Sequence, residues 1–315
     1  MNAPTSPRVS VVIPTYNASR SIAQTIASVA AQTFRSLEVV IVDDTSSDNT
    51  EEIARLALEA SGLPHTIVRL PENSGPAHAR NVGVRRSRGE FVAFLDADDL
   101  WLPKKIERQL GLLDANPSAR LCGCQAAWID GEGNTVSLLF NGLPEVMADG
   151  WKQLLWDCYI ATPCALVRRA DLGTAPFNPV LRVGEDRDLW IRVARRGSVV
   201  LAQERLVDIR LSPSSYMASS GHLTWQYVEP MIEGHIRSLS NRLSLRDKFR
   251  ARAKVYSDIG RGLCASPGGF WHGSWYLIRA IVLGHRPLDC ARFLVFTAPG
   301  VKNLKRYLKD FLEMA

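Results

Sequence analysis

The sequence has little of what secreted and membrane proteins usually carry. Its 315 residues include six cysteines, too few for a disulfide framework, and the spacing of Cys122 and Cys124 does not suit a zinc knuckle. The first ten residues lack the basic and then apolar pattern of a signal peptide. No apolar run reaches the ~20 residues of a membrane-spanning helix. We therefore expect a cytoplasmic protein whose thiols are reduced core residues.

Charge is spread unevenly along the chain. Residues 1–220 carry 23 Lys/Arg against 25 Asp/Glu, whereas residues 221–315 carry 15 against 7, a net charge of +8. A basic end suits either nucleic acid or an anionic membrane. A nucleic-acid partner would require a recognisable reading module, and the sequence has none, so we expect no nucleic acid.

The first hundred residues alternate between two hydrophobic periods. Short apolar, β-branched runs predict strands, and apolar residues three or four positions apart predict helices between them. A capping-box pattern, Asp48 to Glu51, marks one helix start. This alternation is typical of an α/β fold with a mostly parallel sheet and helices on both faces. The predicted strands are 9–13, 37–42, 66–68 and 91–95.

The pattern after residue 100 is less regular. Pro103 suits the first turn of a helix that ends at Asn116, and helices predominate from Trp225 onward. We expect an α/β domain over 1–220 and a basic, mainly helical region over 221–315. Between them we expect strands in 121–129, loops in 130–149, and helices in 151–159 and from Glu185 to Gly197.

Three polar clusters follow the predicted strands, at 14–17, 43–44 and 96–99. In parallel sheets ligands bind beyond the carboxyl ends of the strands, so these clusters should meet at one edge. Asp96, Asp98 and Asp99 offer the hard oxygen ligands that Mg²⁺ or Mn²⁺ prefers beside a diphosphate. The alternative is a solvated turn with helix-capping acids. The position after a wholly apolar strand, opposite Asp43 and Asp44, favours the cation.

Other residues suggest a nucleotide. Tyr16 can stack on a base, Asp44 can accept from a base or ribose, and Arg80 can pair with a diphosphate. Taken singly, Tyr16 also fits a half-buried loop aromatic, and Arg80 fits a surface charge. Glu185 and Asp186 open a helix, where a carboxylate can serve as a cap or as a general base.

Four stretches together resemble the bacterial family 2 glycosyltransferases, which have the GT-A fold. They occur in the family's order and cover about two thirds of the chain. They read VSVVIPTYN, LEVVIVDDTSSDNT, NSGPAHARNVGVRRSRGEFVAFLDADDLWLPKKIERQ and GEDRDLWIRVARRG.

The resemblance implies that a sugar moves from a nucleotide donor, such as a UDP-, GDP- or dTDP-sugar, with inversion and with Mn²⁺ or Mg²⁺ bound. It places Asp186 as the catalytic base and Glu185 as its neighbour at the acceptor. Asp98, then Asp99, match the metal ligands of the metal-and-ribose motif that Asp96 begins. The remaining matches, in the nucleotide pocket, are Pro14, Thr15, Tyr16 and Asp44.

The chain departs from the processive members of the family. It lacks their Gln-x-x-Arg-Trp motif and their flanking membrane helices, which favours transfer of single sugars to a glycan or lipid-linked acceptor. A polar loop from Arg210 to Met217 is placed to close over the diphosphate. His222 is either an extra metal ligand or an ordinary exposed histidine, and the second is the preferred interpretation.

The tail interleaves aromatic and basic residues. Such helices suit the interface of an anionic membrane, on the inner face of the cell membrane, and equally suit a helical subdomain or a homodimer partner. The residues concerned are Trp271, Trp275, Tyr276, Ile278, Arg279, Ile281, Val282, Arg286, Arg292, Phe293, Leu294, Val295, Phe296, Lys302, Leu304, Lys305, Arg306, Leu308, Lys309 and Leu312.

Two alternatives differ in class. A sugar nucleotidyltransferase should carry a glycine-rich, basic loop after its first strand, where this chain reads PTYNASRS. A non-catalytic homologue that only holds a nucleotide sugar should have lost the base or a metal acid, and both are present here. The sequence therefore favours a transferase.

Overall fold

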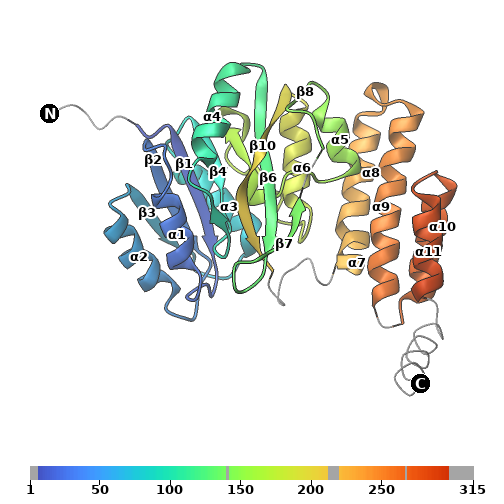
Figure 1. The fold of residues 1–315 in the computed structure, drawn as a ribbon, viewed down its shortest axis with the longest axis horizontal. Coiled ribbons are helices and arrows are strands. Elements are labelled where there is room, and N and C mark those ends of the chain that lie inside the picture. Colours follow the sequence, from blue (N-terminus) through green and yellow to red (C-terminus); the bar gives the residue numbers. More distant parts are fainter. Residues whose placement is uncertain (1–5, 140–141, 212–219, 267, 298–315) are drawn as a thin grey trace. The chain divides into compact units, whose positions relative to one another are not determined.

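The computed structural model describes residues 6–139, 142–211, 220–266 and 268–297, and it divides the chain into two compact units (Figure 1). Unit 1 holds the residues up to 213 except two short segments. Those segments, 155–157 and 182–184, belong with the residues from 214 onward in unit 2.

Unit 1 is built on one sheet whose strand order is β3-β2-β1-β4-β9-β6-β10-β5, with β7 beside β6 and β8 beside β10. Strands β3, β2, β1 and β4 are parallel, as are β6 and β10, while β9 runs antiparallel between the two groups. The sheet is therefore mixed. Its strands are β1 Val9–Thr15, β2 Leu37–Asp43, β3 His65–Arg69, β4 Phe91–Phe94, β5 Leu100–Trp101, β6 Ala119–Ile129, β7 Thr135–Leu139, β8 Val146–Met147, β9 Leu166–Arg168 and β10 Ser198–Arg210.

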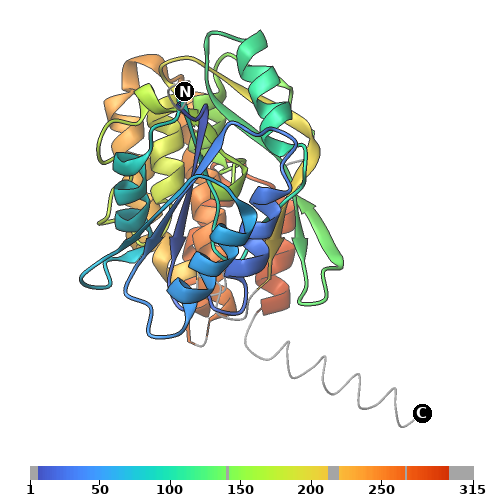
Figure 2. The ribbon, with the colours of Figure 1, turned by 90° about the vertical axis from the view of Figure 1, so that its left-hand side faces the viewer.

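Helices cover both faces of this sheet. Figure 2 shows α3 and α6 on one side and α1 and α4 on the other. This follows from right-handed crossovers, because the chain moves outward from β1 to β3 and then returns to β4 through α3. The helices of unit 1 are α1 Ile22–Ala30, α2 Thr50–Ser61, α3 Gly75–Arg86, α4 Lys105–Ala115, α5 Gly150–Trp156 and α6 Glu185–Ala194.

The strands next to the site are buried on both faces. Every residue of β2 and β4 is buried, as continuous apolar runs in a helix-covered parallel sheet require. Val12 pairs with Val40 on one side and Phe94 on the other, which brings the ends of β1, β2 and β4 to the same edge. The polar residues that follow these strands therefore start from one edge, as the sequence predicted.

Several local predictions were wrong in detail. No side chain of the N-cap residue Asn49 caps α2; instead Asp48 Oδ1 accepts from the Thr50 backbone N–H at 3.0 Å, so no capping box forms. Helix α4 begins two residues after Pro103. The stretch predicted as loop contains β7 and β8, and α5 ends at Trp156, not at residue 159. Short strands on a sheet's edge give too little periodicity to be read from sequence.

Unit 2 is helical, as predicted for residues after about 220. The 21-residue helix α9 lies at its centre and packs against α7, α8, α10 and α11. Ser244 and Asp247 form a full capping box at its start. None of the described helices is long and apolar enough to cross a membrane. The helices are α7 Ser220–Leu223, α8 Glu229–Ser238, α9 Leu245–Ala265, α10 Phe270–Val282 and α11 Pro287–Thr297, with a π-helical turn over Thr224–Val228.

The close contact between α3 and β1 gives a test of this packing. A Cβ added at Gly83 would lie 2.3 Å from Val12 Cγ1, so Gly83→Ala forces the helix away from the strand. We expect a loss of about 1–3 kcal/mol in the free energy of unfolding, measured with urea.

Gly111 is the matched control. It lies in α4 with nothing within 4 Å of an added Cβ. Gly111→Ala should raise the free energy of unfolding by up to about 1 kcal/mol, because alanine is the better helix former. Equal effects of the two substitutions would contradict the described contact.

Candidate functional site

The loop after β1 presents the side chain of Tyr16 to solvent. Tyr16 is 54% exposed, so its ring is accessible to a ligand. Thr15 is buried, and its hydroxyl lies 3.4 Å from the carbonyl oxygen of Val42, directed into the sheet. Pro14, the last residue but one of β1, is partly buried. Of the three predicted pocket residues, only Tyr16 therefore offers a free side chain.

Two acids at the end of β2, Asp43 in the strand and Asp44 just after it, hold the local backbone. Asp44 is buried and accepts hydrogen bonds from the backbone N–H groups of Ser74 and Gly75, both at 2.8 Å, at the start of α3. Asp43 is also buried and pairs with Arg69 at 2.9 Å. Asp44 thus fixes α3 against β2, and a role at a nucleoside would use the remaining lone pairs of its carboxylate.

The acidic loop after β4, residues 96–99, is held by its own turn and by α1. The backbone N–H of Asp99 donates to the Asp96 carbonyl oxygen at 3.1 Å and closes a turn. The hydroxyl of Thr25, on α1, lies 2.9 Å from the carbonyl oxygen of Ala97 and 3.0 Å from that of Asp99. Of the metal candidates, Asp98 is exposed, whereas Asp99 is only 3% exposed. An incoming cation can therefore reach Asp98 more readily.

Arg210, the last residue of β10, donates hydrogen bonds to this loop. Its backbone N–H donates to Asp99 Oδ1 at 3.0 Å, and its guanidinium donates to the Asp98 carbonyl oxygen at 2.6 Å. It also hydrogen-bonds to Gln24 on α1. Burial, and then repulsion from Asp96 and Asp98, raise the pKa of Asp99, which these contacts with Arg210 partly offset. In the sequence Arg210 stood out only as the start of a polar loop that ends at Met217, and residues 212–217 of that loop lie outside the described residues.

Arg80 joins the acidic loop to α6. Its Nη2 donates to Asp96 at 2.7 Å and its Nη1 to Glu185 at 2.9 Å, although Glu185 lies 105 positions further along the chain. The side chain is 6% exposed. Burial alone lowers the pKa of Arg80, but the two carboxylates more than offset this and raise it. Both terminal nitrogens are thus engaged by the protein, and the expected contact of Arg80 with a diphosphate stays a prediction.

An aromatic cluster holds Arg80 in place. The guanidinium carbon lies 5.5 Å from the centroid of the Phe177 ring. Phe177 packs edge-on to Phe94 of β4, at 5.1 Å, and to Trp190 of α6, at 6.2 Å. Asn81, next to Arg80, exchanges two hydrogen bonds of 2.8 Å with the Phe177 backbone. Phe177 lies in the weakly patterned part of the sequence, where no periodicity marked it.

The two acids of α6 have unequal surroundings. Burial, and then the charge of Asp186, raise the pKa of Glu185 to about 7, although Arg80 opposes this. Burial also raises the pKa of Asp186, against the Arg187 backbone N–H at 2.6 Å and the Thr162 hydroxyl at 3.2 Å. A carboxylate with a raised pKa is a stronger base, which suits proton abstraction. Thr162 was not found from the sequence.

The charge of the site leaves room for a cation. The acidic loop and the start of α6 carry five carboxylates, and two arginines contact three of them: the Arg80 guanidinium pairs with Asp96 and Glu185, and the Arg210 backbone N–H donates to Asp99. In the described part of the chain, no group of three or more His, Cys, Asp or Glu residues is arranged to hold a metal alone. This donor set fits Mg²⁺ or Mn²⁺, which takes one or two carboxylates and completes its shell with phosphates and water.

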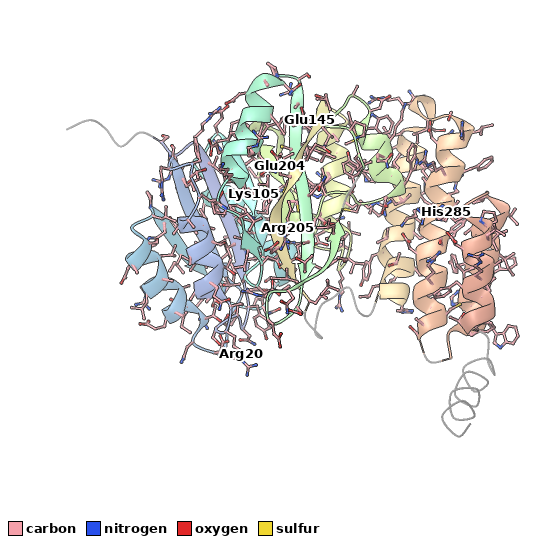
Figure 3. All side chains as sticks on the ribbon, viewed as in Figure 1. Arg20, Lys105, Glu145, Glu204, Arg205 and His285 are labelled. Carbon is pink, nitrogen blue, oxygen red and sulfur yellow. The ribbon has the colours of Figure 1, made fainter. Side chains whose placement is uncertain are left out.

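Lys105 is a second buried cation of unit 1, and it was not predicted. Its side chain is fully buried at the start of α4, where Figure 3 labels it. The amine donates to Gln109 at 2.7 Å and lies 4.0 Å from the centroid of the Trp101 ring. Burial lowers the pKa of Lys105. Gln109 in turn donates to the Cys164 carbonyl oxygen at 2.7 Å, so this network ties α4 to the segment that carries Thr162.

His222 belongs to unit 2 and is exposed. Its ring lies 5.3 Å from the ring of Trp225. This exposure is what the preferred interpretation of His222 expects, and a role as a metal ligand stays untested.

Comparison with known proteins identifies the family. The sequence profile of glycosyl transferase family 2 matches residues 10–173, more than half of the chain. The chain belongs to glycosyltransferase family 2. It is 32% identical over 226 residues to the putative teichuronic acid biosynthesis glycosyltransferase TuaG of Bacillus subtilis, covering 70% of this chain and 86% of TuaG.

Other members of the family are longer. An uncharacterized glycosyltransferase of Rickettsia conorii, RC0461, is 30% identical over 205 residues, which is 65% of this chain and 33% of that protein. The chain thus spans about a third of the length of this and two similar Rickettsia relatives.

Solved structures of low sequence identity show the same GT-A fold. TarS residues 1–349 of S. aureus, in complex with UDP, superimposes with a TM-score of 0.57 at 19% identity, over 95% of this chain and 91% of that one. The mannosyltransferase PcManGT of Pyrobaculum calidifontis, in complex with GDP-Man and Mn²⁺, gives 0.60 at 20% identity, over 96% and 84%. The predicted fold class and family are therefore confirmed.

The Arg80 ion pairs lead to a stability prediction. Arg80→Ala leaves Asp96 and Glu185 without their shared partner in a buried site, so the free energy of unfolding should fall by about 3–5 kcal/mol. The matched control is Arg108→Ala, which breaks an exposed pair with Glu204 and should cost less than about 1 kcal/mol. Urea unfolding measures both losses, and equal losses would contradict a buried ion-pair role for Arg80.

The raised pKa of Glu185 predicts a pH dependence. In the unfolded chain this carboxyl ionises near its ordinary value, and in the folded protein only near about 7, so the folded state binds the extra proton between these values. Stability therefore falls as pH rises from about 5 to 8. Thermal unfolding of Glu185→Gln should show a smaller fall than the wild type over this range. An identical pH profile in both proteins would mean that Glu185 is not perturbed.

Proposed function

We propose that this family 2 member transfers a single sugar from a nucleoside-diphosphate donor to an acceptor hydroxyl, with inversion and with a divalent cation. The observation that carries the proposal is the Arg80 bridge, which draws Asp96 of the acidic loop and Glu185 of α6 to the same guanidinium. A diphosphate-and-cation site and a base then lie side by side, as a displacement at the anomeric carbon requires.

Asp186 supplies the base in this mechanism. Its carboxylate takes the proton of the acceptor hydroxyl as the oxygen attacks the sugar from the face opposite the diphosphate. The Thr162 hydroxyl and the Arg187 backbone N–H orient the carboxylate and favour its ionised form, against the burial that raises its pKa. Glu185, beside it, is proposed to contact the acceptor. Its side chain is only 13% exposed, which limits its contact with water.

The donor side rests on the acidic loop. Asp98 would hold the cation, whose charge stabilises the departing diphosphate when it is bound. Asp99, buried and fixed by Arg210, would act mainly by shaping the loop. Asp96, Tyr16 and Asp44 are proposed at the nucleoside.

Solved structures of similar fold support a nucleotide-sugar donor and suggest which nucleotide to test first. TarS has been solved with UDP-GlcNAc, and PcManGT with GDP-Man and Mn²⁺. A UDP- or GDP-sugar is therefore proposed first, ahead of a dTDP-sugar. TuaG is named for teichuronic acid biosynthesis, which supports a role in assembling a bacterial polysaccharide. A glycan or lipid-linked acceptor, peripheral membrane contact and a homodimer stay predictions.

The donor site is tested by calorimetric titration. UDP, GDP and dTDP are each titrated with and without Mn²⁺ into wild type, Asp98→Ala and the control Asp289→Ala, an exposed acid on α11. We expect Mn²⁺-dependent binding of one nucleotide, weakened at least about tenfold by Asp98→Ala and unchanged in the control. No binding of any nucleotide under either condition would refute the proposed donor site.

The base is tested separately. Asp186→Asn should lower transfer, followed as release of the nucleoside diphosphate from the donor so identified, by about 10²–10⁴-fold. Nucleotide affinity should stay close to wild type, since Asp186 faces the acceptor. Transfer at the wild-type rate by Asp186→Asn would assign the base to another residue.

A further inference from the structure

Helix α10 of unit 2 has an apolar face that the described residues leave exposed. Its inner face is buried and packs on α9, where Gly260 lies so close that an added Cβ would meet Leu277 Cγ at 2.6 Å. Its outer face forms one stripe at helical spacing. The members of this stripe and their exposed fractions are Trp271 (77%), Trp275 (60%), Ile278 (47%) and Val282 (79%).

A helix that is apolar on both faces requires a second partner. Surface helices of globular proteins normally turn charged or polar residues toward solvent. Here the outward positions carry two tryptophans, which combine a large apolar ring with an N–H donor and are enriched at the boundary between lipid and water. On α11, next along the chain and packed beside α10, Leu288 is 73% exposed.

The charge of the same helices decides what the partner is. Residues 220–297 carry 11 Lys/Arg and 5 Asp/Glu, a net charge of +6. Four of these acids are engaged within unit 2. Glu233 pairs with Arg252 at 2.6 Å and Asp258 with Lys254 at 2.7 Å, Glu229 accepts from the Tyr276 hydroxyl at 2.9 Å, and Asp247 belongs to the capping box of α9.

Two arginines of the same part of unit 2 are exposed to solvent. Arg286 lies just after α10 and Arg292 lies on α11, and both are exposed. A second copy of the chain would bring the same positive charge against itself, which opposes pairing. An anionic lipid surface offers the opposite charge together with an apolar layer.

We propose that the α10 stripe, with the exposed arginines Arg286 and Arg292 of the same unit, binds the surface of an anionic membrane. The rings of Trp271 and Trp275 enter the boundary between headgroups and acyl chains, and the basic side chains contact the headgroups. This inference gives a location to the membrane contact expected of the tail, and it does not depend on the proposed sugar transfer. Tyr276, grouped with the tryptophans in the sequence, is excluded because it is 5% exposed.

Vesicle flotation of the full-length protein tests the proposal. Wild type should float with vesicles of phosphatidylcholine mixed with phosphatidylglycerol, less with phosphatidylcholine alone, and less at high salt. Replacing both residues, Trp271→Ser with Trp275→Ser, should lower the ratio of bound to free protein by about tenfold for each tryptophan. The control is Leu56→Ser, which changes another exposed apolar residue (56%), on α2 in unit 1, and should float as wild type does.

Three results would overturn the proposal: no flotation of wild type, equal flotation of the double variant and wild type, or equal loss in the control. A wild-type dimer in sedimentation that the double variant dissociates, without vesicle binding, would assign the stripe to a second copy. Urea unfolding of the same preparations shows whether the variants are folded, and calorimetric nucleotide binding reports the donor site. The binding measurement separates a failed membrane face from a failed donor site.

Discussion

Arg80 carries a buried positive charge between two carboxylates, Asp96 and Glu185, that belong to different parts of the chain. A buried arginine is stable only when such partners are present, and a carboxylate beside it is stable only while the arginine remains. The acidic loop after β4 and the start of α6 therefore depend on one another through this side chain. The Phe177 ring packs against the Arg80 guanidinium, and Asn81 holds Phe177 in place through its backbone.

This arrangement explains why the site forms at the carboxyl edge of the sheet. The parallel strands β2, β1 and β4 end together, and the loops that follow them are short and tied to neighbouring helices. Asp44 caps α3, which carries Arg80, and Arg210 fixes the acidic loop to β10. The exposed groups that remain, Tyr16 and Asp98, are those that a ligand can contact without disturbing the frame.

The sequence predicted the part of this frame that local patterns determine. Strands β1, β2 and β4 have mostly apolar runs and helix α6 has a clear helical period, and the acids lie directly after β2 and β4 and at the start of α6. The supporting contacts could not be read in the same way. Thr162 and Phe177 lie in irregular segments and meet α6 and Arg80 only through the tertiary fold. Likewise, periodicity alone did not separate the buried Tyr276 from the exposed Trp275 one position before it.

The most direct test of the Arg80 bridge is a double-mutant cycle between Asp96→Asn and Glu185→Gln, read as the affinity for the nucleoside diphosphate with Mn²⁺. Both side chains contact Arg80, and one lies on the acidic loop and the other on α6. If the bridge couples them, the effects of the two substitutions will be non-additive by about 0.5–3 kcal/mol. Strictly additive effects would contradict the account, because the acidic loop and α6 would then bind their ligands independently.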